Sequence, residues 1–475
     1  MSPTSMARSH HLERSMGLTG AIATVVAGTL GAGLFVTLGT ASSTTGPSII
    51  VVVVATGLLA MAIATNYSWI ASVFPGAGGA YTYISRTFDN RLPGFIVTWS
   101  KWLGYMAADA VLALGFGSYL KVFYPAVDPA MAGFVLLSVL FVINLIGTKS
   151  YSVVQNAIFL LLIVSVLVLV LPGIGHIRVA NYQPFFTGGL AGMASATVPM
   201  FYAYIGIAVA AQMGAEVKRP HRNLPLAMVG GTGFLIVLYT LTAVVLYGVV
   251  DDYRVLANSE RPLATASQAF LGEYGTAIVA FGGLLATASS VHAVMAAGIK
   301  MPYAWAWDEV FPQCFSVVSR RFHTPHWSLL TLYVVSSALI FWSAGLDQAL
   351  SIATFSYLIA YLTVSLTVGY VYLRRGDIRS RAAFQPGGWF WLPILVGVLG
   401  SLAILFQAAN WGALFSGNFA ELSTLAIYLP WLAIGLLVFS VYWALGRRRG
   451  DDVAAILATV PGVLDEPSID KRRAR

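Results

Sequence analysis

Long apolar segments recur along this chain, and they limit what it can fold into more than any other feature. Residues 49–64, for example, read IIVVVVATGLLAMAIA without one charged side chain. A helix that crosses the hydrocarbon core of a bilayer needs about 20 mostly apolar residues. Only helices and closed barrels satisfy every backbone polar group there, and these runs lack the short alternating strands of a barrel. We therefore predict an all-α integral membrane protein.

The chain has room for about twelve such spans plus short loops. Of its 475 residues, 58% are hydrophobic and 10% are charged, whereas a soluble domain carries about 25% charged residues. The composition therefore excludes a water-soluble domain. We predict twelve helices, at 17–44, 47–74, 93–123, 130–148, 152–172, 194–215, 225–249, 274–300, 326–345, 348–373, 389–410 and 423–446.

The basic residues predict the orientation of these helices. Loops on the cytoplasmic side of membrane proteins are enriched in Lys and Arg. With the N-terminus inside, only Lys121, Arg178, Arg254 and Arg261 are left on the outer side. We therefore expect a multi-pass protein of the plasma membrane with both termini in the cytoplasm. The net charge of +8 follows from the same bias, and no nucleic-acid partner is expected.

The chain offers little for covalent or metal chemistry. Its one cysteine, Cys314, allows no internal disulfide and no thiolate metal site. The first apolar run starts near Met16 and continues into a full span, so no cleavable signal peptide is expected. We find no phosphate loop and no His-Glu-x-x-His or Gly-x-Ser-x-Gly pattern. ATP-driven transport and a membrane-embedded enzyme are therefore disfavoured, and no cofactor is expected.

Two of the predicted helices contain interruptions. The first carries Gly28, Gly31 and Gly33 within six residues, and the sixth carries Pro199 and Gly206. Close packing through small residues is one interpretation of such glycines, and an unwound segment facing a cavity is the other. Interrupted helices at matching positions of two halves mark transporter binding sites. Half-helix N-termini attract carboxylates, and free carbonyls attract ammonium groups or cations.

Four motifs occur in order along the chain. They are LGAGLF at 30–35, PGAGGAYTY at 75–83, NLIGTK at 144–149 and EVKRPHRNLP at 216–225. With these motifs the chain resembles the amino acid–polyamine–organocation (APC) transporter superfamily. The likeness runs from about residue 17 to the end of the tenth helix, and more weakly to the twelfth.

The resemblance implies a leucine-transporter-like fold with a 5+5 inverted repeat and broken helices 1 and 6. A ten-helix core, 17–375, divides into repeats at 17–172 and 194–375. Two more helices follow at 389–446, between cytoplasmic tails at 1–16 and 447–475. The C-terminal tail is expected to be flexible apart from one short helix around 453–460.

The resemblance also implies a substrate site between helices 1, 3, 6, 8 and 10. In similar transporters the substrate carboxylate meets backbone N–H groups at the positions of Ala32 and Gly33. Its amine meets carbonyls at the positions of Thr29, Tyr202 and Ile205. An aromatic side chain closes over the ligand, here Tyr202 or Tyr204. The predicted set is Thr29, Leu30, Gly31, Ala32, Gly33, Tyr202, Ala203, Tyr204, Ile205 and Gly206.

The coupling ion, H+ or Na+, cannot be carried over from the family. Ala32 replaces the family's helix 1 serine, and Ala208 stands where some relatives carry a glutamate. Other relatives have a lysine in the middle of helix 5, whereas residues 152–171 carry no charge here. Each of these departures removes a group that takes part in binding or coupling in relatives.

Polar residues within the spans supply the coupling candidates. A charge at the depth of Asp109 costs about 2.5–3.5 kcal/mol, so this residue is expected to have a task or a partner. The functional alternatives are proton coupling and a counter-charge for a basic substrate. The structural alternative is a hydrogen-bonded packing acid. Lys101 is expected to snorkel to the interface. Glu216 is expected to pair with Lys218 or Arg219, as a gate or an anchor. His292 is a second proton candidate, with structural packing as the alternative.

Hydroxyls on helix 8 make a sodium site the other candidate. Thr287, Ser289 and Ser290 are predicted to lie opposite the helix 1 break, and a sodium ion would meet Gly28, Ser289 and Ser290. The alternative is that each hydroxyl bonds to the backbone of its own helix.

These observations predict a secondary active amino acid transporter that works by alternating access. The region of the breaks is rich in small and aromatic residues and poor in charge, which favours neutral amino acids. A cationic amino acid or polyamine transporter or exchanger is the alternative, with Asp109 as the acid. A sensor or channel that keeps the fold is the alternative of another class. The expected partners are a small amino acid and the lipid bilayer, and the chain is a monomer or a homodimer.

Overall fold

The computed structural model describes residues 14–146, 151–319, 324–342, 346–382, 384–409 and 423–461. Within these ranges ten helices are long and apolar enough to cross a membrane, and shorter apolar helices lie at Ile158–Ile174 and His326–Trp342. Together they match the twelve predicted spans, so the all-α prediction is confirmed. Three segments with predicted motifs or tails lie outside the described ranges, namely 1–13, 147–149 and 462–475. The side chains of Ala32 and Gly33 lie outside them as well.

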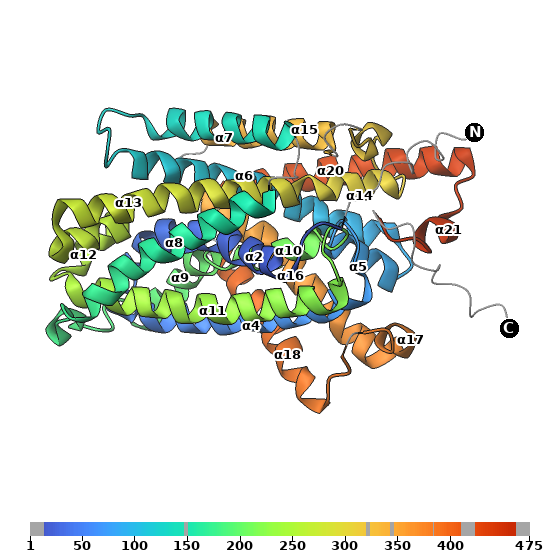
Figure 1. Ribbon diagram of the computed structural model, residues 1–475. Helices are drawn as coiled ribbons and strands as arrows, with labels where there is room; N and C mark the ends of the chain where they lie inside the picture. The colour runs from blue at the N-terminus through green and yellow to red at the C-terminus, as the bar shows by residue number, and fades with distance from the viewer. Residues whose placement is uncertain are drawn as a thin grey trace.

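The spanning helices follow one another with short connections (Figure 1). They are α2 (Leu18–Ala32) with α3 (Leu38–Ser42), α4 (Ile49–Val73), α6 (Arg91–Leu120), α7 (Pro129–Ile146), α8 (Tyr151–Ile174), α9 (Gly189–Tyr202) with α10 (Val209–Gln212), α11 (Pro220–Val249), α13 (Pro262–Gly298), α15 (His326–Trp342), α16 (Leu346–Arg374), α18 (Trp391–Ala408) and α20 (Ser423–Arg449). Shorter helices are α5 (Ala80–Thr87), α12 (Tyr253–Ala257), α14 (Lys300–Trp307), α17 (Gly376–Arg379) and α21 (Val453–Leu457).

Both broken helices are present, with different geometry. Helix 6 stops at Tyr202 and resumes as a 3-10 turn, η4 (Ile205–Ala208), before α10. Helix 1 departs from the predicted unwinding at 29–33, because α2 stays α-helical to Ala32 and then widens into a π-helical turn, η1 (Gly33–Thr37). Such π-turns inside α-helices are frequent at functional sites.

Three helices begin five residues or more before their predicted starts, at Gly189, Pro220 and Pro262, and the last two have a reason in local chemistry. The helix predicted from residue 225 begins at Pro220, which takes the favoured first position and leaves Pro225 inside the helix. The helix predicted from 274 begins at Pro262 and bends at Gly272, whose φ of 64° suits glycine. Hydropathy marks only the apolar part of such a helix.

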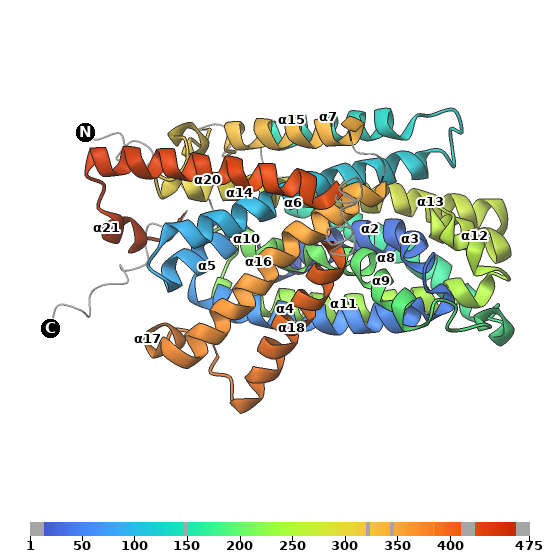
Figure 2. The same cartoon turned by 180° about the vertical axis from the view of Figure 1, so that it is seen from behind.

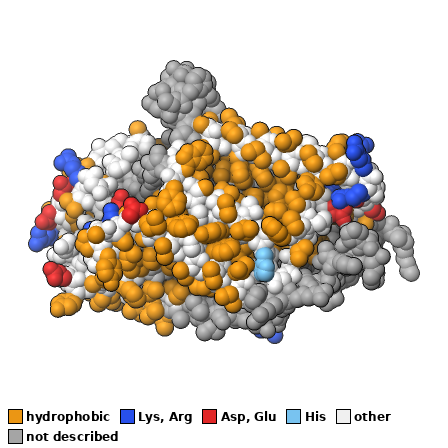
Figure 3. Space-filling model, turned by 90° about the horizontal axis from the view of Figure 1, so that it is seen from above, with side chains coloured by type: hydrophobic (Ala, Val, Ile, Leu, Met, Phe, Trp, Pro, Cys, Tyr) orange, Lys and Arg blue, Asp and Glu red, His pale blue; other side chains and the backbone are white. Residues whose placement is uncertain are grey.

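Helix 1 lies at the centre of the bundle. In its most apolar stretch 94% of the residues are buried, against 22% for α7 and 22% for α20. The inner helix contacts α13, α11 and α8. Apolar side chains cover the middle of the face seen in Figure 3, and charged ones gather toward its two ends. This distribution fits a bundle that meets lipid with its peripheral helices.

The two ends of the described chain lie at the same end of the bundle. Met16 pairs with Val217, Ala77 pairs with Met213, and the amide of Ala77 donates to the Pro461 carbonyl (2.9 Å). Figure 2 shows α21, α5 and α14 grouped at this end and α12 at the other. We call these the α21 end and the α12 end. An even number of spans accounts for this arrangement.

Candidate functional site

The breaks of helices 1 and 6 meet in the middle of the bundle. Gly206 lies against α2, where an added Cβ would come within 2.4 Å of Thr29 Oγ1 and 2.5 Å of the Gly28 carbonyl oxygen. Gly31 lies against α13, with the corresponding distance to the Ala286 carbonyl oxygen only 2.1 Å. Of the two interpretations of the helix 1 glycines, close packing therefore describes Gly31. These glycines let three backbones converge around the site.

Two tyrosine hydroxyls bind two of the three carbonyls that the resemblance reserves for a substrate amine, those of Thr29 and Ile205. Tyr239 of α11 donates to the Thr29 carbonyl (3.0 Å) and to the Ala203 carbonyl (3.2 Å). Tyr361 of α16 donates to the Ile205 carbonyl. Sequence reasoning missed both residues. The available signal was a tyrosine in mid-span, because a buried phenol hydroxyl needs a hydrogen-bond partner.

The two candidate closing aromatics point to different helices. Tyr202 donates to the Ala108 carbonyl of α6 (3.3 Å), and Tyr204 donates to the Val53 carbonyl of α4 (3.2 Å). Both side chains are fully buried, as is Leu30. Ala32 and Gly33 form the junction between α2 and η1. The predicted site is thus a closed set of contacts in this conformation.

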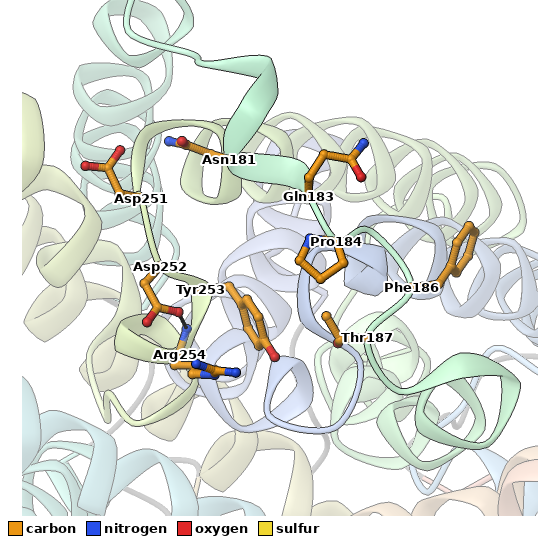
Figure 4. Close-up of a pocket in the computed structure, with 9 residues that line it drawn as sticks. All are labelled: Asn181, Gln183, Pro184, Phe186, Thr187, Asp251, Asp252, Tyr253 and Arg254. Carbon is orange, nitrogen blue, oxygen red and sulfur yellow. Dashed lines mark hydrogen bonds between the residues drawn. The ribbon is translucent and has the colours of Figure 1, made fainter.

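The surface pocket in Figure 4 lies elsewhere, at the α12 end. It has a volume of about 470 Å³ and is lined by the loop that holds Asn181 and Thr187 and by the start of α12, with Asp251 and Arg254. None of its lining residues belongs to the predicted substrate set. The helix breaks remain the candidate site, as the resemblance implies, and their role in substrate binding stays a prediction.

Asp109 is buried between α6 and α15. Its Oδ2 accepts a hydrogen bond from Ser336 of α15 (3.4 Å), and its Oδ1 has no hydrogen-bond partner among the described residues. The residue before it, Ala108, supplies the carbonyl for Tyr202. Asp109 is therefore one residue away from a contact with the helix 6 break, and its role stays a prediction.

The helix 8 hydroxyls divide between the two predicted arrangements. Ser290 donates across to the Ala27 carbonyl of helix 1 (2.5 Å), whereas Thr287 bonds to Gly283 of its own helix (2.8 Å). Ser289 is buried. His292 faces α7 instead, with its Nδ1 3.0 Å from Asn144 Nδ2. Ser290 therefore contacts helix 1 at the Ala27 carbonyl, one residue before the predicted Gly28.

The prediction that Lys101 snorkels to the interface is wrong. Its side chain is fully buried, and Nζ lies 5.2 Å from the ring centroids of Tyr67 and Tyr361, 5.5 Å from that of Tyr357 and 5.8 Å from that of Tyr105. α6 begins at Arg91, so Lys101 stands ten residues, or about 15 Å, into the helix. The side chain is enclosed by these rings instead of extending toward the end of the bundle.

Buried ion pairs tie the α21 end together. Glu216 pairs with Lys300 at the start of α14 (2.5 Å) and not with Lys218 or Arg219 as predicted, because those two side chains are exposed. Arg86 of α5 pairs with Asp308, which also accepts from the Tyr81 hydroxyl (2.7 Å). Tyr81 belongs to the second motif, so that motif contributes directly to this network.

The C-terminal segment docks onto this network as far as residue 461. The Thr459 carbonyl accepts from Arg86 Nε (3.1 Å) and Nη2 (2.9 Å). Arg449 lies 3.6 Å from Glu309. The short predicted helix is present as α21. The docking of the C-terminal segment depends on side chains hundreds of residues away along the chain. The sequence of the tail alone therefore could not predict it.

Comparison of the sequence with known proteins identifies the family of the chain. A sequence model of the amino acid permease family matches residues 16–439. The chain is 25% identical over 437 residues to a methylthioribose transporter of Bacillus subtilis (strain 168), covering 87% of this chain and 90% of the relative. It is 25% identical to the branched-chain amino acid permease BcaP of the same organism, covering 91% and 93%.

A relative with another substrate class has similar identity. The vacuolar cationic amino acid transporter 4 of Arabidopsis thaliana is 27% identical over 395 residues, which are 76% of this chain and 64% of the relative. The family match spans most of the chain, and the apolar helices identify a multi-pass membrane protein. This chain belongs to the amino acid permease family of the APC superfamily.

Proposed function

We propose that this protein is a secondary active transporter of neutral amino acids that works by alternating access. The observation that carries the proposal is the hydrogen bonding at the helix breaks. Tyr239 and Tyr361 donate to the Thr29 and Ile205 carbonyls, which are the acceptors that an amino acid's ammonium group needs. Buried carbonyls are rarely left without a donor. The hydroxyls therefore occupy the donor positions that the ammonium group of a bound amino acid would take.

Binding then exchanges one set of donors for another. The ammonium group displaces the two hydroxyls, and the carboxylate meets the backbone N–H groups of Ala32 and Gly33 at the start of η1. The tyrosine rings, which include Tyr202 and Tyr204, supply an apolar lining for the side chain. A site with few charges and many aromatic groups favours apolar ligands, and the branched-chain permease among the relatives supports neutral substrates.

A cationic substrate is the second candidate, and one observation favours it. Asp109 keeps a carboxylate oxygen without a hydrogen-bond partner in the described structure, one residue from the Tyr202 contact. A carboxylate in that position can pair with a basic side chain. The relative named as a cationic amino acid transporter supports this alternative.

The coupling ion and the orientation belong to the same proposal. A sodium ion would use Gly28, Ser289 and Ser290, whereas proton coupling would use Asp109 or His292. We propose that the α21 end faces the cytoplasm, because the described loops there carry most of the basic side chains. The protein then resides in the plasma membrane with both termini inside, as a monomer or a homodimer.

Uptake into proteoliposomes tests the function. Purified protein is reconstituted and offered radiolabelled leucine, isoleucine, valine, phenylalanine, lysine and arginine, with a proton gradient or a sodium gradient imposed separately. We expect saturable uptake of the neutral substrates and counterflow from preloaded vesicles. Preference for lysine and arginine would favour the cationic alternative. Failure to transport any amino acid under gradient or exchange conditions would overturn the proposal.

A further inference from the structure

Lys101 sits in a closed cage of tyrosine rings inside the bundle. Tyr67 comes from α4, Tyr105 from α6 itself, and Tyr357 and Tyr361 from α16. All four ring centroids lie within 5.8 Å of Nζ, and neither the lysine nor any of these tyrosines is exposed by more than 1%. Nζ has no hydrogen-bond partner among the described residues. We call this arrangement the Lys101 cage.

The cage contains no counter-charge. The titratable groups that face Nζ are the four phenols, and no described carboxylate forms an ion pair with Lys101. The nearest acid along α6, Asp109, is eight residues on, or about 12 Å along the helix axis. It is directed to Ser336 of α15.

The energetics of the cage oppose a permanent charge. Burying an unpaired ammonium ion costs several kcal/mol even after the protein relaxes. A cation–π contact returns roughly 0.5–2 kcal/mol, and the distances here are near the outer limit of about 6 Å for such contacts. A neutral amine avoids the desolvation cost. The closed cage therefore suits an amine that gains its proton only when water enters.

Tyr361 links the cage to the helix 6 break. Its ring is one wall of the cage, 5.2 Å from Nζ, and its hydroxyl donates to the Ile205 carbonyl. A donor that takes over this carbonyl removes the bond that holds the Tyr361 hydroxyl. The ring is then free to move, and the wall between Lys101 and the break can open. Substrate occupancy at the helix 6 break and water access to Lys101 thus both depend on the Tyr361 side chain.

We propose that Lys101 couples transport to a proton gradient, a role that rests on the proposed transport function. When the cage opens, the amine takes a proton from cavity water and becomes an ammonium ion. After the transporter reorients, the ammonium ion gives that proton to water on the opposite side of the membrane, and the cage closes around the neutral amine. One proton therefore crosses the membrane with each cycle of the cage.

The test compares three variants with the wild type in proteoliposomes. Lys101→Met keeps the length of the side chain without a titratable group, and Lys101→His keeps a titratable group with a lower ordinary pKa. Lys121→Met, at the end of the same helix and outside the cage, is the matched control. Three readouts are recorded: counterflow exchange, accumulation driven by a proton gradient, and substrate-induced pH change inside the vesicles.

We expect Lys101→Met to lose gradient-driven accumulation and the internal pH change while it keeps counterflow exchange. Lys101→His should move the pH profile of gradient-driven accumulation to more acidic pH, and Lys121→Met should match the wild type. Gradient-driven accumulation in Lys101→Met would overturn the proposal. So would loss of exchange in both Lys101 variants, which would mark the residue as structural.

The outcomes also separate this proposal from the function on which it rests. Wild-type amino acid uptake that follows a sodium gradient and ignores pH would leave the proposed function standing and overturn the role of Lys101. A wild type that transports no amino acid in any mode would overturn both.

Discussion

Arg86 and Asp308 form a buried ion pair that joins α5 to the turn after α14. The guanidinium donates to both carboxylate oxygens, and the side chains are only 1% and 0% exposed. Arg91 adds a hydrogen bond to the backbone carbonyl of Asp308 (2.8 Å). Because Arg86 also holds the Thr459 carbonyl, the pair connects the bundle to the C-terminal segment.

Asp308→Asn should therefore destabilise the protein strongly. Removing one member of a buried pair leaves the other charge uncompensated, which costs about 3–5 kcal/mol. Thermal unfolding in detergent measures the effect. Asp377→Asn is the control, because Asp377 pairs with Arg375 while 52% exposed, and such pairs contribute about 0–1 kcal/mol. Equal losses in the two variants would contradict the importance of the buried pair.

Gly31→Ala should abolish or strongly reduce transport. The new methyl group would lie 2.1 Å from the Ala286 carbonyl oxygen, and because that atom belongs to the α13 backbone it cannot rotate away. Overpacking of this kind costs about 1–3 kcal/mol. Gly230→Ala on α11 is the control, with no atom within 4 Å of the added carbon. Exchange rates in proteoliposomes compare the two, and wild-type exchange in Gly31→Ala would contradict the close approach of helices 1 and 8.

Tyr239→Phe should raise the affinity for substrate. The hydroxyl donates to the Thr29 and Ala203 carbonyls, and a buried carbonyl without its donor costs about 1–3 kcal/mol. That cost falls on the empty state and is relieved when an ammonium group binds. Each kcal/mol corresponds to roughly fivefold in Kd.

Equilibrium binding of radiolabelled leucine to detergent-solubilised protein measures this change. Tyr247→Phe is the matched control on the same helix, because its hydroxyl contacts the Leu38 carbonyl (3.4 Å), outside the predicted site. We expect its Kd to match the wild type. An unchanged or weaker affinity in Tyr239→Phe would show that the hydroxyl does not compete with the substrate.

Docking of the C-terminal segment should weaken as the pH rises. Burial raises the pKa of Glu309, the hydrogen bond and charge of Asp451 raise it further, and Arg449 opposes them. A group whose pKa is raised in the folded state contributes stability below its unfolded pKa and loses that stability as the pH rises through the folded value. Protonated Glu309 therefore favours docking, and ionised Glu309 opposes it.

Glu309→Gln should remove this pH dependence and protect the segment at alkaline pH. Limited trypsin digestion at Arg447, Arg448 and Arg449 across a pH series, normalised to an unstructured peptide, measures the docking. Glu273→Gln, on the exposed surface of α13 at the α12 end, should behave as the wild type. Digestion of Glu309→Gln that still accelerates with pH would assign the effect to another group.

The spans could be predicted because lipid imposes one condition on every residue of a crossing helix. Hydropathy therefore located all twelve, and the helix 6 interruption was visible in Pro199 and Gly206. The start of α13 at Pro262 was missed, because a helix that continues beyond the lipid need not stay apolar. The π-turn at Gly33 was missed because glycine permits several backbone geometries, and packing on α13 selects among them.

The sequence by itself determined the class of the protein, the positions of the apolar spans among the described residues and where helix 6 breaks. These properties follow from the local balance of apolar, charged and helix-breaking residues. The tertiary structure decided the partners: Lys300 for Glu216, the tyrosine cage for Lys101, and Tyr239 and Tyr361 for the carbonyls at the breaks. A side chain's partner depends on how each helix is rotated against neighbours from distant parts of the chain. That rotation minimises the cost of buried polar groups across the whole bundle, which no single segment specifies.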